Sequence, residues 1–234
     1  RNMDKSSGGR FGKSKIMYFP ITIVDNFYSN FDEVKEYATN LQFFKDEQHG
    51  LPYTMPGLKS KFLHDINPSF FRQSALKILT LFFLNGNVSY ECRTRFEKIT
   101  PYGEEYNKEG WIHSDDDNRL SALFFIDGQH EEGTSFFKKK NVGVEMSTFE
   151  EKRLLFSGYP VDPHTYNKKL KEHNEKYTEI LNVPCIPNRL IVFDSSCYHR
   201  ANGLGTTTKP RLIQTFFFGK VTSDFFPIPE KERI

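Results

Sequence analysis

The sequence predicts an α+β protein that is mostly β, with two early helices packed on one face of a sandwich or barrel of antiparallel strands. Two helix-like stretches come first, at about residues 30–44 and 68–84, and apolar residues recur in them at helical spacing. From about residue 88 the hydrophobic period becomes strand-like, and Gly, Asn and Asp separate the segments. The 24 Phe and 11 Tyr among 234 residues provide an aromatic core, which suits β structure.

Each element has a local signal. Residues 1–15 are polar, glycine-rich and basic, which predicts a disordered tail. Residues 16–27, IMYFPITIVDNF, predict an opening strand at a sheet edge, because Pro20 has no N–H to donate to a neighbour. Asn30 is placed to cap the first helix and Pro68 opens the second. The main strands are expected at VSYECRTRFEKIT (88–100), RLSALFFIDG (119–128), GTSFFKKK (133–140), NRLIVFDSS (188–196) and RLIQTFFFGKV (211–221).

One interruption breaks the strand pattern, at about residues 138–187. It contains the charged, helix-capable run HTYNKKLKEHNEKYTEIL, which we interpret as an excursion from the sheets. No internal repeat and no domain boundary is evident. We therefore predict a single domain over residues 16–234 that carries this insertion.

Composition limits the classes of function. The 32 Lys and Arg nearly balance the 30 Asp and Glu, for a formal net charge of +2, whereas an electrostatic nucleic-acid binder needs a basic surplus. The three cysteines form no CxxC motif, so neither a disulfide framework nor a zinc knuckle is indicated. No signal peptide is seen, nor an apolar run near the roughly 20 residues that a membrane span requires. These features predict a cytoplasmic protein without a nucleic-acid or membrane partner.

The residues that carry chemistry begin in the stretch GWIHSDDD. His113 and Asp115 are two residues apart, so on an extended strand their side chains point the same way and can share a metal ion. Carboxylates are costly to bury unless they are paired or bound to metal, so this placement beside an apolar strand favours a site. We interpret Asp116 and Asp117 as solvated turn residues. His199, which follows a later apolar strand, is the candidate third ligand.

An arginine completes the set. If a hairpin centres near Gly205, His199 and Arg211 lie across from each other on one sheet face. A guanidinium buried among aromatic residues needs an anion, and a carboxylate bound through both oxygens is its best partner. Two histidines and one carboxylate with open positions are the ligand set of non-haem Fe(II) oxygenases.

These motifs resemble the Fe(II)/2-oxoglutarate-dependent dioxygenases of the prolyl-hydroxylase-like kind. PYGEEYNKEGWIHSDDD is similar to the family's tyrosine-glycine stretch ahead of its His-x-Asp. The strand, turn and Gly-Thr segment that follow in the family are similar to RLSALFFID…GTSFF. The family's strands that carry the second histidine and then the arginine are similar to PNRLIVFDSSCYHRANG…PRLIQTFFF. The resemblance covers about residues 102–218, apart from the insertion.

The resemblance implies a double-stranded β-helix, or jelly roll, and a hydroxylase that acts on a C–H bond of an amino acid, a peptide or a small molecule. Prolyl hydroxylation is the reaction that the family favours. The implied cofactors are Fe(II), held by His113, Asp115 and His199, with 2-oxoglutarate as co-substrate and O2. Arg211 would bind the distal carboxylate of the co-substrate.

The sequence departs from the family pattern at two positions. Ile213 stands where many members carry Ser or Thr two residues after the arginine, and Phe125 where prolyl hydroxylases often place a tyrosine. A second donor to the co-substrate carboxylate must therefore come from elsewhere, and we expect Tyr102 to supply it.

Two other interpretations of the same residues stay open. A divalent-metal hydrolase uses similar His and carboxylate ligands, although the chain has no HExxH motif. A non-catalytic jelly-roll binding module would keep the sheets without a working metal site. The sequence leaves the substrate and the oligomeric state undetermined.

Overall fold

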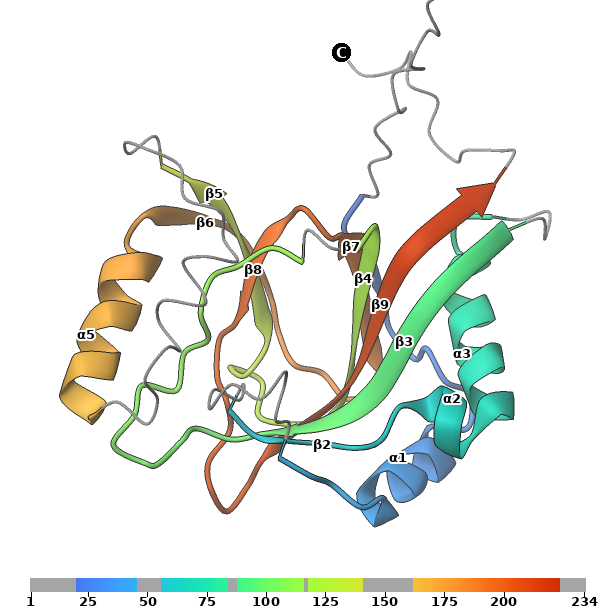
Figure 1. Ribbon diagram of the computed structural model, residues 1–234, viewed down its shortest axis with the longest axis horizontal. Helices are drawn as coiled ribbons and strands as arrows, with labels where there is room; N and C mark the ends of the chain where they lie inside the picture. The colour runs from blue at the N-terminus through green and yellow to red at the C-terminus, as the bar shows by residue number, and fades with distance from the viewer. Residues whose placement is uncertain (1–19, 46–55, 84–87, 116–117, 141–161, 224–234) are drawn as a thin grey trace, which may run out of the picture.

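The protein consists of two antiparallel sheets with helices on their outer sides (Figure 1). The computed structural model describes residues 20–45, 56–83, 88–115, 118–140 and 162–223. The tail predicted at residues 1–15 lies outside these ranges, and the predicted extent of the domain, 16–234, stays a prediction.

The larger sheet has six strands in the order β1-β7-β4-β9-β3-β2, and the smaller sheet has three in the order β6-β5-β8. All neighbouring strands run antiparallel. The larger sheet consists of β1 (Thr22–Val24), β2 (Leu58–Lys59), β3 (Val88–Ile99), β4 (Leu120–Asp127), β7 (Arg189–Asp194) and β9 (Arg211–Ser223). The smaller sheet consists of β5 (Thr134–Lys139), β6 (Tyr177–Val183) and β8 (Tyr198–Ala201).

The central strands of the larger sheet are buried on both faces, and their sequences are therefore nearly continuous apolar runs. Phe124 of β4 and Val192 of β7 belong to the core on the helical side of the sheet. Their neighbours Phe125 and Phe193 point the other way and belong to a second core that includes Phe136 of the smaller sheet. The second core therefore lies between the two sheets and packs them together.

Three helices cover the outer face of the larger sheet (Figure 1). The sequence predicted two of them, at about residues 30–44 and 68–84, and did not predict the short one between them. They are α1 (Phe31–Asn40), α2 (Leu63–Ile66) and α3 (Pro68–Leu79). The side chain of Asn67 caps α3 by accepting a hydrogen bond from the Phe70 N–H at 3.1 Å. Asn30 precedes α1, but its side chain makes no such bond, and its amide nitrogen donates to Glu33 Oε2 at 2.9 Å.

A fourth described helix, α5 (Pro163–Asn174), lies beside the smaller sheet, on the side away from the larger one (Figure 1). It confirms that the charged run is helix-forming, but the interpretation of the whole run as an excursion from the sheets was wrong. Residues 177–183 form β6, which pairs with β5 along the edge of the smaller sheet. Only the first and last residues of β6 are buried, so the strand has no apolar alternation to reveal it.

The predicted hairpin across Gly205 was also wrong. His199 in β8 pairs with Phe136 of β5, whereas Arg211 in β9 pairs with Ile99 of β3. The two residues therefore belong to different sheets, and the chain between them crosses from one sheet to the other. Local turn chemistry marks such a connection as a turn but carries no information on which strands the flanking segments join.

None of the helices within the described ranges is long and apolar enough to cross a membrane.

Candidate metal centre

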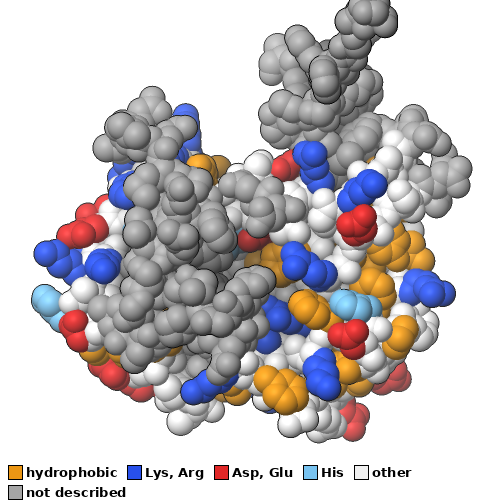
Figure 2. All heavy atoms as spheres, in the orientation of Figure 1, with side chains coloured by type: hydrophobic (Ala, Val, Ile, Leu, Met, Phe, Trp, Pro, Cys, Tyr) orange, Lys and Arg blue, Asp and Glu red, His pale blue; other side chains and the backbone are white. Residues whose placement is uncertain are grey.

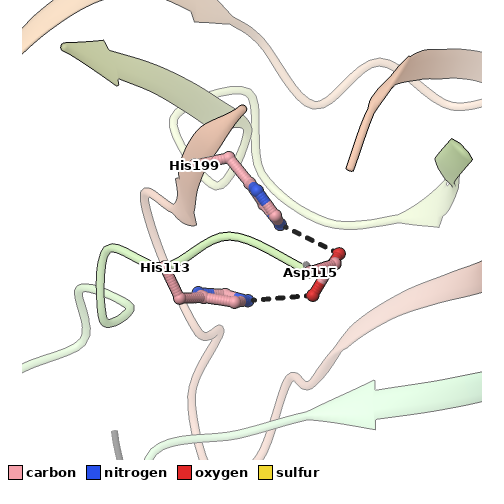
Figure 3. A group of neighbouring side chains, drawn as sticks. All are labelled: His113, Asp115 and His199. Atoms are coloured by element: carbon pink, nitrogen blue, oxygen red, sulfur yellow. Dashed lines mark ion pairs between the residues drawn. The ribbon is translucent and has the colours of Figure 1, made fainter. Parts of the chain in front are cut away.

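The structure brings His113, Asp115 and His199 together (Figure 3). The His113 Nε2 lies 3.7 Å from Asp115 Oδ1, and the His199 Nε2 lies 3.6 Å from Asp115 Oδ2. One ligand atom from each residue lies within 4.8 Å of the other two. A divalent ion binds imidazole nitrogen and carboxylate oxygen at about 2.0 to 2.2 Å, so one ion between these atoms would contact all three after small side-chain adjustments.

Backbone pairing fixes the two histidines side by side. The His113 N–H donates to the His199 carbonyl at 3.0 Å, and the His199 N–H donates back at 2.8 Å. This reciprocal pair is the close hydrogen-bonded arrangement of an antiparallel ladder, which puts both side chains on one face. Asp115 follows two residues later, and its N–H donates to the Ser195 carbonyl at 2.8 Å.

The two imidazoles are oriented in the same way, by a hydrogen bond from Nδ1 to the backbone carbonyl two residues earlier. The Nδ1 of His113 lies 2.8 Å from the Trp111 carbonyl, and the Nδ1 of His199 lies 2.9 Å from the Cys197 carbonyl. A carbonyl only accepts hydrogen bonds, so each Nδ1 carries the proton and each Nε2 presents a lone pair. Metal-binding histidines in proteins are held in this way.

Two serines hold the carboxylate. The Ser121 hydroxyl donates to Asp115 Oδ2 at 3.0 Å, and Ser195 Oγ lies 2.9 Å from Ser121 Oγ. Sequence reasoning missed both residues. The available signal was a lone serine among the apolar residues 120–126 of β4, because a buried hydroxyl needs a partner.

The end of α5 holds the segment that precedes His113. The Asn174 side chain accepts from the Ile112 N–H at 3.1 Å and donates to the Gly110 carbonyl at 3.1 Å. The His173 Nε2 lies 2.8 Å from the Ile112 carbonyl, and its ring stacks on Trp111 with centroids 3.4 Å apart. The predicted insertion therefore contributes to the architecture of the site, which the sequence did not reveal.

Arg211 is a buried cation that has no acidic partner among the described residues. Its residue is 1% exposed, and no carboxylate of the described residues lies within 4.0 Å of its nitrogens. Its contacts are two long hydrogen bonds, at 3.3 Å to the Gly203 carbonyl and at 3.2 Å to Thr134 Oγ1. Its Nε has no hydrogen-bond partner in the described part of the chain. Burial lowers the pKa of Arg211 to about 10, so the group is still charged at neutral pH.

The surroundings of Arg211 include Phe125, one of the two departures from the family pattern. Its guanidinium lies 5.1 Å from the ring centroid of Phe125, which gives a cation–π contact. The Tyr102 ring packs edge-on against Tyr106 and Tyr166, with centroids 5.6 Å away in each case. Its predicted role as carboxylate donor stays a prediction. The structure adds Thr134 as a hydroxyl already in contact with the guanidinium.

Comparisons with known proteins give the family of this chain and the solved structures that share its fold. A family model matches residues 16–202, which is most of the chain, and its description is a family of unknown function (DUF6445). The chain belongs to this family. A search of the curated proteins found no match.

Solved structures share the fold at low sequence identity. The non-heme alpha ketoglutarate dependent epimerase SnoN from nogalamycin biosynthesis is 13% identical, with a TM-score of 0.50 over 86% of this chain and 79% of that one. EvdO2 from Micromonospora carbonacea var. aurantiaca is 14% identical, with a TM-score of 0.50 over 89% and 90% of the two chains. A Pseudomonas putida prolyl-4-hydroxylase is 14% identical over 85% and 91%, with a TM-score of 0.45. The first two likenesses confirm the predicted jelly-roll fold.

Proposed function

We propose that the protein is an Fe(II)- and 2-oxoglutarate-dependent oxygenase that hydroxylates a small molecule or a peptide. The observation that carries this proposal is Arg211, a buried charge that the described residues leave without an anion. Burying an unpaired charge is costly, so such a group is expected where a ligand supplies the opposite charge. A dicarboxylate co-substrate would do so.

The positions of Arg211 and the three candidate ligands suit a ligand that joins them. Thr134, which contacts Arg211, stands two residues before Phe136 on β5, and Phe136 pairs with His199. Two residues along a strand span about 7 Å. A five-carbon dicarboxylate can bridge that distance, with one end at the metal and the other at the guanidinium.

The ligand atoms also fit the proposed ion. Two neutral imidazoles and one carboxylate form the set that non-haem iron sites use, although other divalent ions bind the same atoms. His113, Asp115 and His199 would hold Fe(II), and Arg211 with the Thr134 hydroxyl would hold the distal carboxylate of 2-oxoglutarate. When bound, these groups supply the chemistry in which O2, 2-oxoglutarate and a C–H bond give an alcohol, succinate and CO2.

The chain itself contributes orientation and a dry environment. The Trp111 and Cys197 carbonyls keep the proton on Nδ1 of each histidine, and Ser121 keeps Asp115 turned towards the ion. Phe136 and Phe193 flank His199 with ring centroids at 6.3 and 4.7 Å. These apolar walls exclude water from the side of the site that faces the core between the sheets.

Arg211 also bears on the two rival interpretations. A metal hydrolase needs the three ligands and a water, but not a buried arginine about two strand residues away from them. A non-catalytic module needs neither. Only the oxygenase interpretation accounts for both features together.

The test is anaerobic addition of Fe(II) and 2-oxoglutarate, which should produce a weak visible charge-transfer band. His199→Ala should abolish the band, and Arg211→Ala should lose it or require far more co-substrate. His164→Ala, which removes an exposed histidine on α5, is the matched control and should leave the band unchanged. An unchanged spectrum in both site variants would contradict the proposal. Succinate release across pooled amino acids, peptides and nucleotides would then identify the substrate.

A further inference from the structure

A row of side chains crosses the larger sheet beside the candidate metal centre. On β4, Ser121 faces the smaller sheet, because its neighbours Leu120 and Ala122 belong to the core on the helical side. Ser121 pairs with Phe217 on β9, and Phe217 pairs with Arg93 on β3. Paired residues lie on the same face of a sheet, so these three side chains follow one another across three adjacent strands.

This row starts at a metal ligand. The Ser121 hydroxyl donates to Asp115 Oδ2 at 3.0 Å. Directly paired residues have Cβ atoms about 4.5 to 5.5 Å apart, so Phe217 is the next side chain beyond the serine that holds the carboxylate. Neighbouring strands lie about 4.8 Å apart, which places the backbone of Arg93 about 10 Å from that of Ser121.

The co-substrate proposed above leaves this part of the sheet uncovered. Six residues along β9, about 20 Å, separate Phe217 from Arg211. A 2-oxoglutarate molecule that joins the ion to Arg211 extends along the other part of β9. A second ligand of the same metal centre therefore meets Phe217 and Arg93.

Phe217 is an apolar side chain outside the described cores. Phe216 and Phe218 are fully buried on the helical side of the sheet, whereas Phe217 is half-buried on the side of the metal centre. It belongs to none of the hydrophobic clusters that the described residues form. A ligand that covers the remaining apolar area of a phenyl ring gains free energy from its removal from water.

Arg93 is an exposed guanidinium that makes no ion pair and no side-chain hydrogen bond with a described residue. Three other arginines differ, since each has a carboxylate partner within 4.0 Å: Arg95, Arg189 and Arg200. A guanidinium binds a carboxylate or a phosphate through two oxygens. On the side of the molecule where β3 lies, Lys and Arg side chains stand beside apolar ones (Figure 2).

We propose that Phe217 and Arg93 form the substrate subsite of the metal centre. They select a molecule in which an apolar or aromatic part adjoins a carboxylate or a phosphate: the apolar part covers Phe217, and the anionic group pairs with Arg93. The assignment of this molecule as the substrate rests on the proposed function, whereas its binding does not.

The test uses the full chain, treated with chelator so that no metal binds the probes. Backbone amide NMR shifts are followed in separate titrations with 3-phenylpropionate, phenyl phosphate, 3-phenylpropionamide and acetate. The first two probes combine a phenyl ring with an anion, the amide lacks the charge, and acetate lacks the ring. We expect saturable shifts at Ser121, Phe217 and Arg93 with the first two, and the tighter of them identifies the preferred anion. The amide and acetate should bind about five- to tenfold more weakly.

Variants assign the binding to the two side chains. Arg93→Gln should raise the dissociation constant of the tighter probe about fivefold, which corresponds to about 1 kcal/mol. Arg93→Lys keeps the charge but not the planar fork, so its affinity should lie between those of Arg93→Gln and the wild type. Phe217→Leu removes the aromatic ring and should weaken binding of both phenyl probes. Arg72→Gln removes an exposed arginine of α3, on the opposite side of the sheet, and should bind like the wild type.

Three results would overturn the inference. They are saturable shifts that occur only around Thr134 and Arg211, equal affinity for 3-phenylpropionate and its amide, and equal affinity in the wild type and the Arg93 and Phe217 variants. The absence of the Fe(II) and 2-oxoglutarate band from the wild type would contradict the proposed function instead. It would leave the probe titrations unaffected, because they are made without metal.

Discussion

Replacing Arg211 by methionine separates the cost of a buried charge from its benefit in binding. Methionine fills a similar space with flexible apolar atoms. The hydrogen bonds that would be lost, at 3.3 and 3.2 Å, are long, and no described carboxylate would lose a partner. Exchanging even a buried ion pair for apolar residues is often neutral or stabilising by about 1 to 4 kcal/mol, and a buried charge without a partner is more costly to keep. We therefore expect the free energy of unfolding of the ligand-free protein to stay level or to rise.

The effect on binding has the opposite sign. Removing one partner of a buried charge pair costs about 3 to 5 kcal/mol, because the other charge is left uncompensated. At about 1.4 kcal/mol per tenfold, Arg211→Met should weaken 2-oxoglutarate binding by a factor of about a hundred to a few thousand.

Two measurements check this prediction: urea unfolding of the ligand-free protein and anaerobic titration of the Fe(II)-loaded protein with 2-oxoglutarate. Arg189→Met is the matched control, because Arg189 forms a two-point pair with the half-exposed Asp25 at 2.6 and 2.8 Å. Arg189 is not among the residues proposed to bind the co-substrate, so this control should keep its affinity for 2-oxoglutarate. Because its side chain is only 14% exposed and pairs through two hydrogen bonds, the control should lose stability. If Arg211→Met strongly destabilised the ligand-free protein and kept its affinity, the arginine would be a structural residue.

Three further predictions concern the residues around the site. Ser121→Ala should lower metal affinity by about 10- to 100-fold, measured by competition with a chromogenic chelator, because Asp115 loses the donor that orients it; unchanged affinity would contradict this role. Asn174→Ala should destabilise the protein by about 1 to 3 kcal/mol in urea unfolding, since two backbone hydrogen bonds are lost. It should also weaken metal binding, whereas a loss of stability alone would limit α5 to a structural role. Burial raises the pKa of the Cys185 thiol to about 11, so about one thiol in a thousand is ionised at pH 8, and a thiol reagent should react slowly until the protein is unfolded. A rapid reaction of the native protein at Cys185 would be inconsistent with that burial.

The sequence predicted best what depends on neighbouring residues. His113 and Asp115 lie two apart on an extended segment, so their shared direction follows from strand geometry alone. The apolar runs of β4 and β7 predicted buried strands because both of their faces meet a core. Helices α1 and α3 followed from apolar spacing and from the Asn-Pro start of α3, whereas the four-residue α2 was not predicted.

Features that depend on long-range pairing were not predicted. The sequence predicted that Arg211 lies across a hairpin from His199, and this pairing was wrong because β8 and β9 belong to different sheets. The contacts of Thr134 with Arg211 and of Ser121 with Asp115 join residues from separate segments of the chain. A polar residue in an apolar strand indicates that a partner exists but not which residue it is. β6 was missed because its exposed middle resembles a solvated segment.

The most direct test of the account is a crystal structure of the protein grown with a redox-inert divalent ion and 2-oxoglutarate. We expect one ion bound by Nε2 of His113, Nε2 of His199 and the Asp115 carboxylate, with the distal carboxylate of 2-oxoglutarate on Arg211 and Thr134. An ion bound elsewhere, or a co-substrate that leaves Arg211 without an anion, would contradict the proposed function.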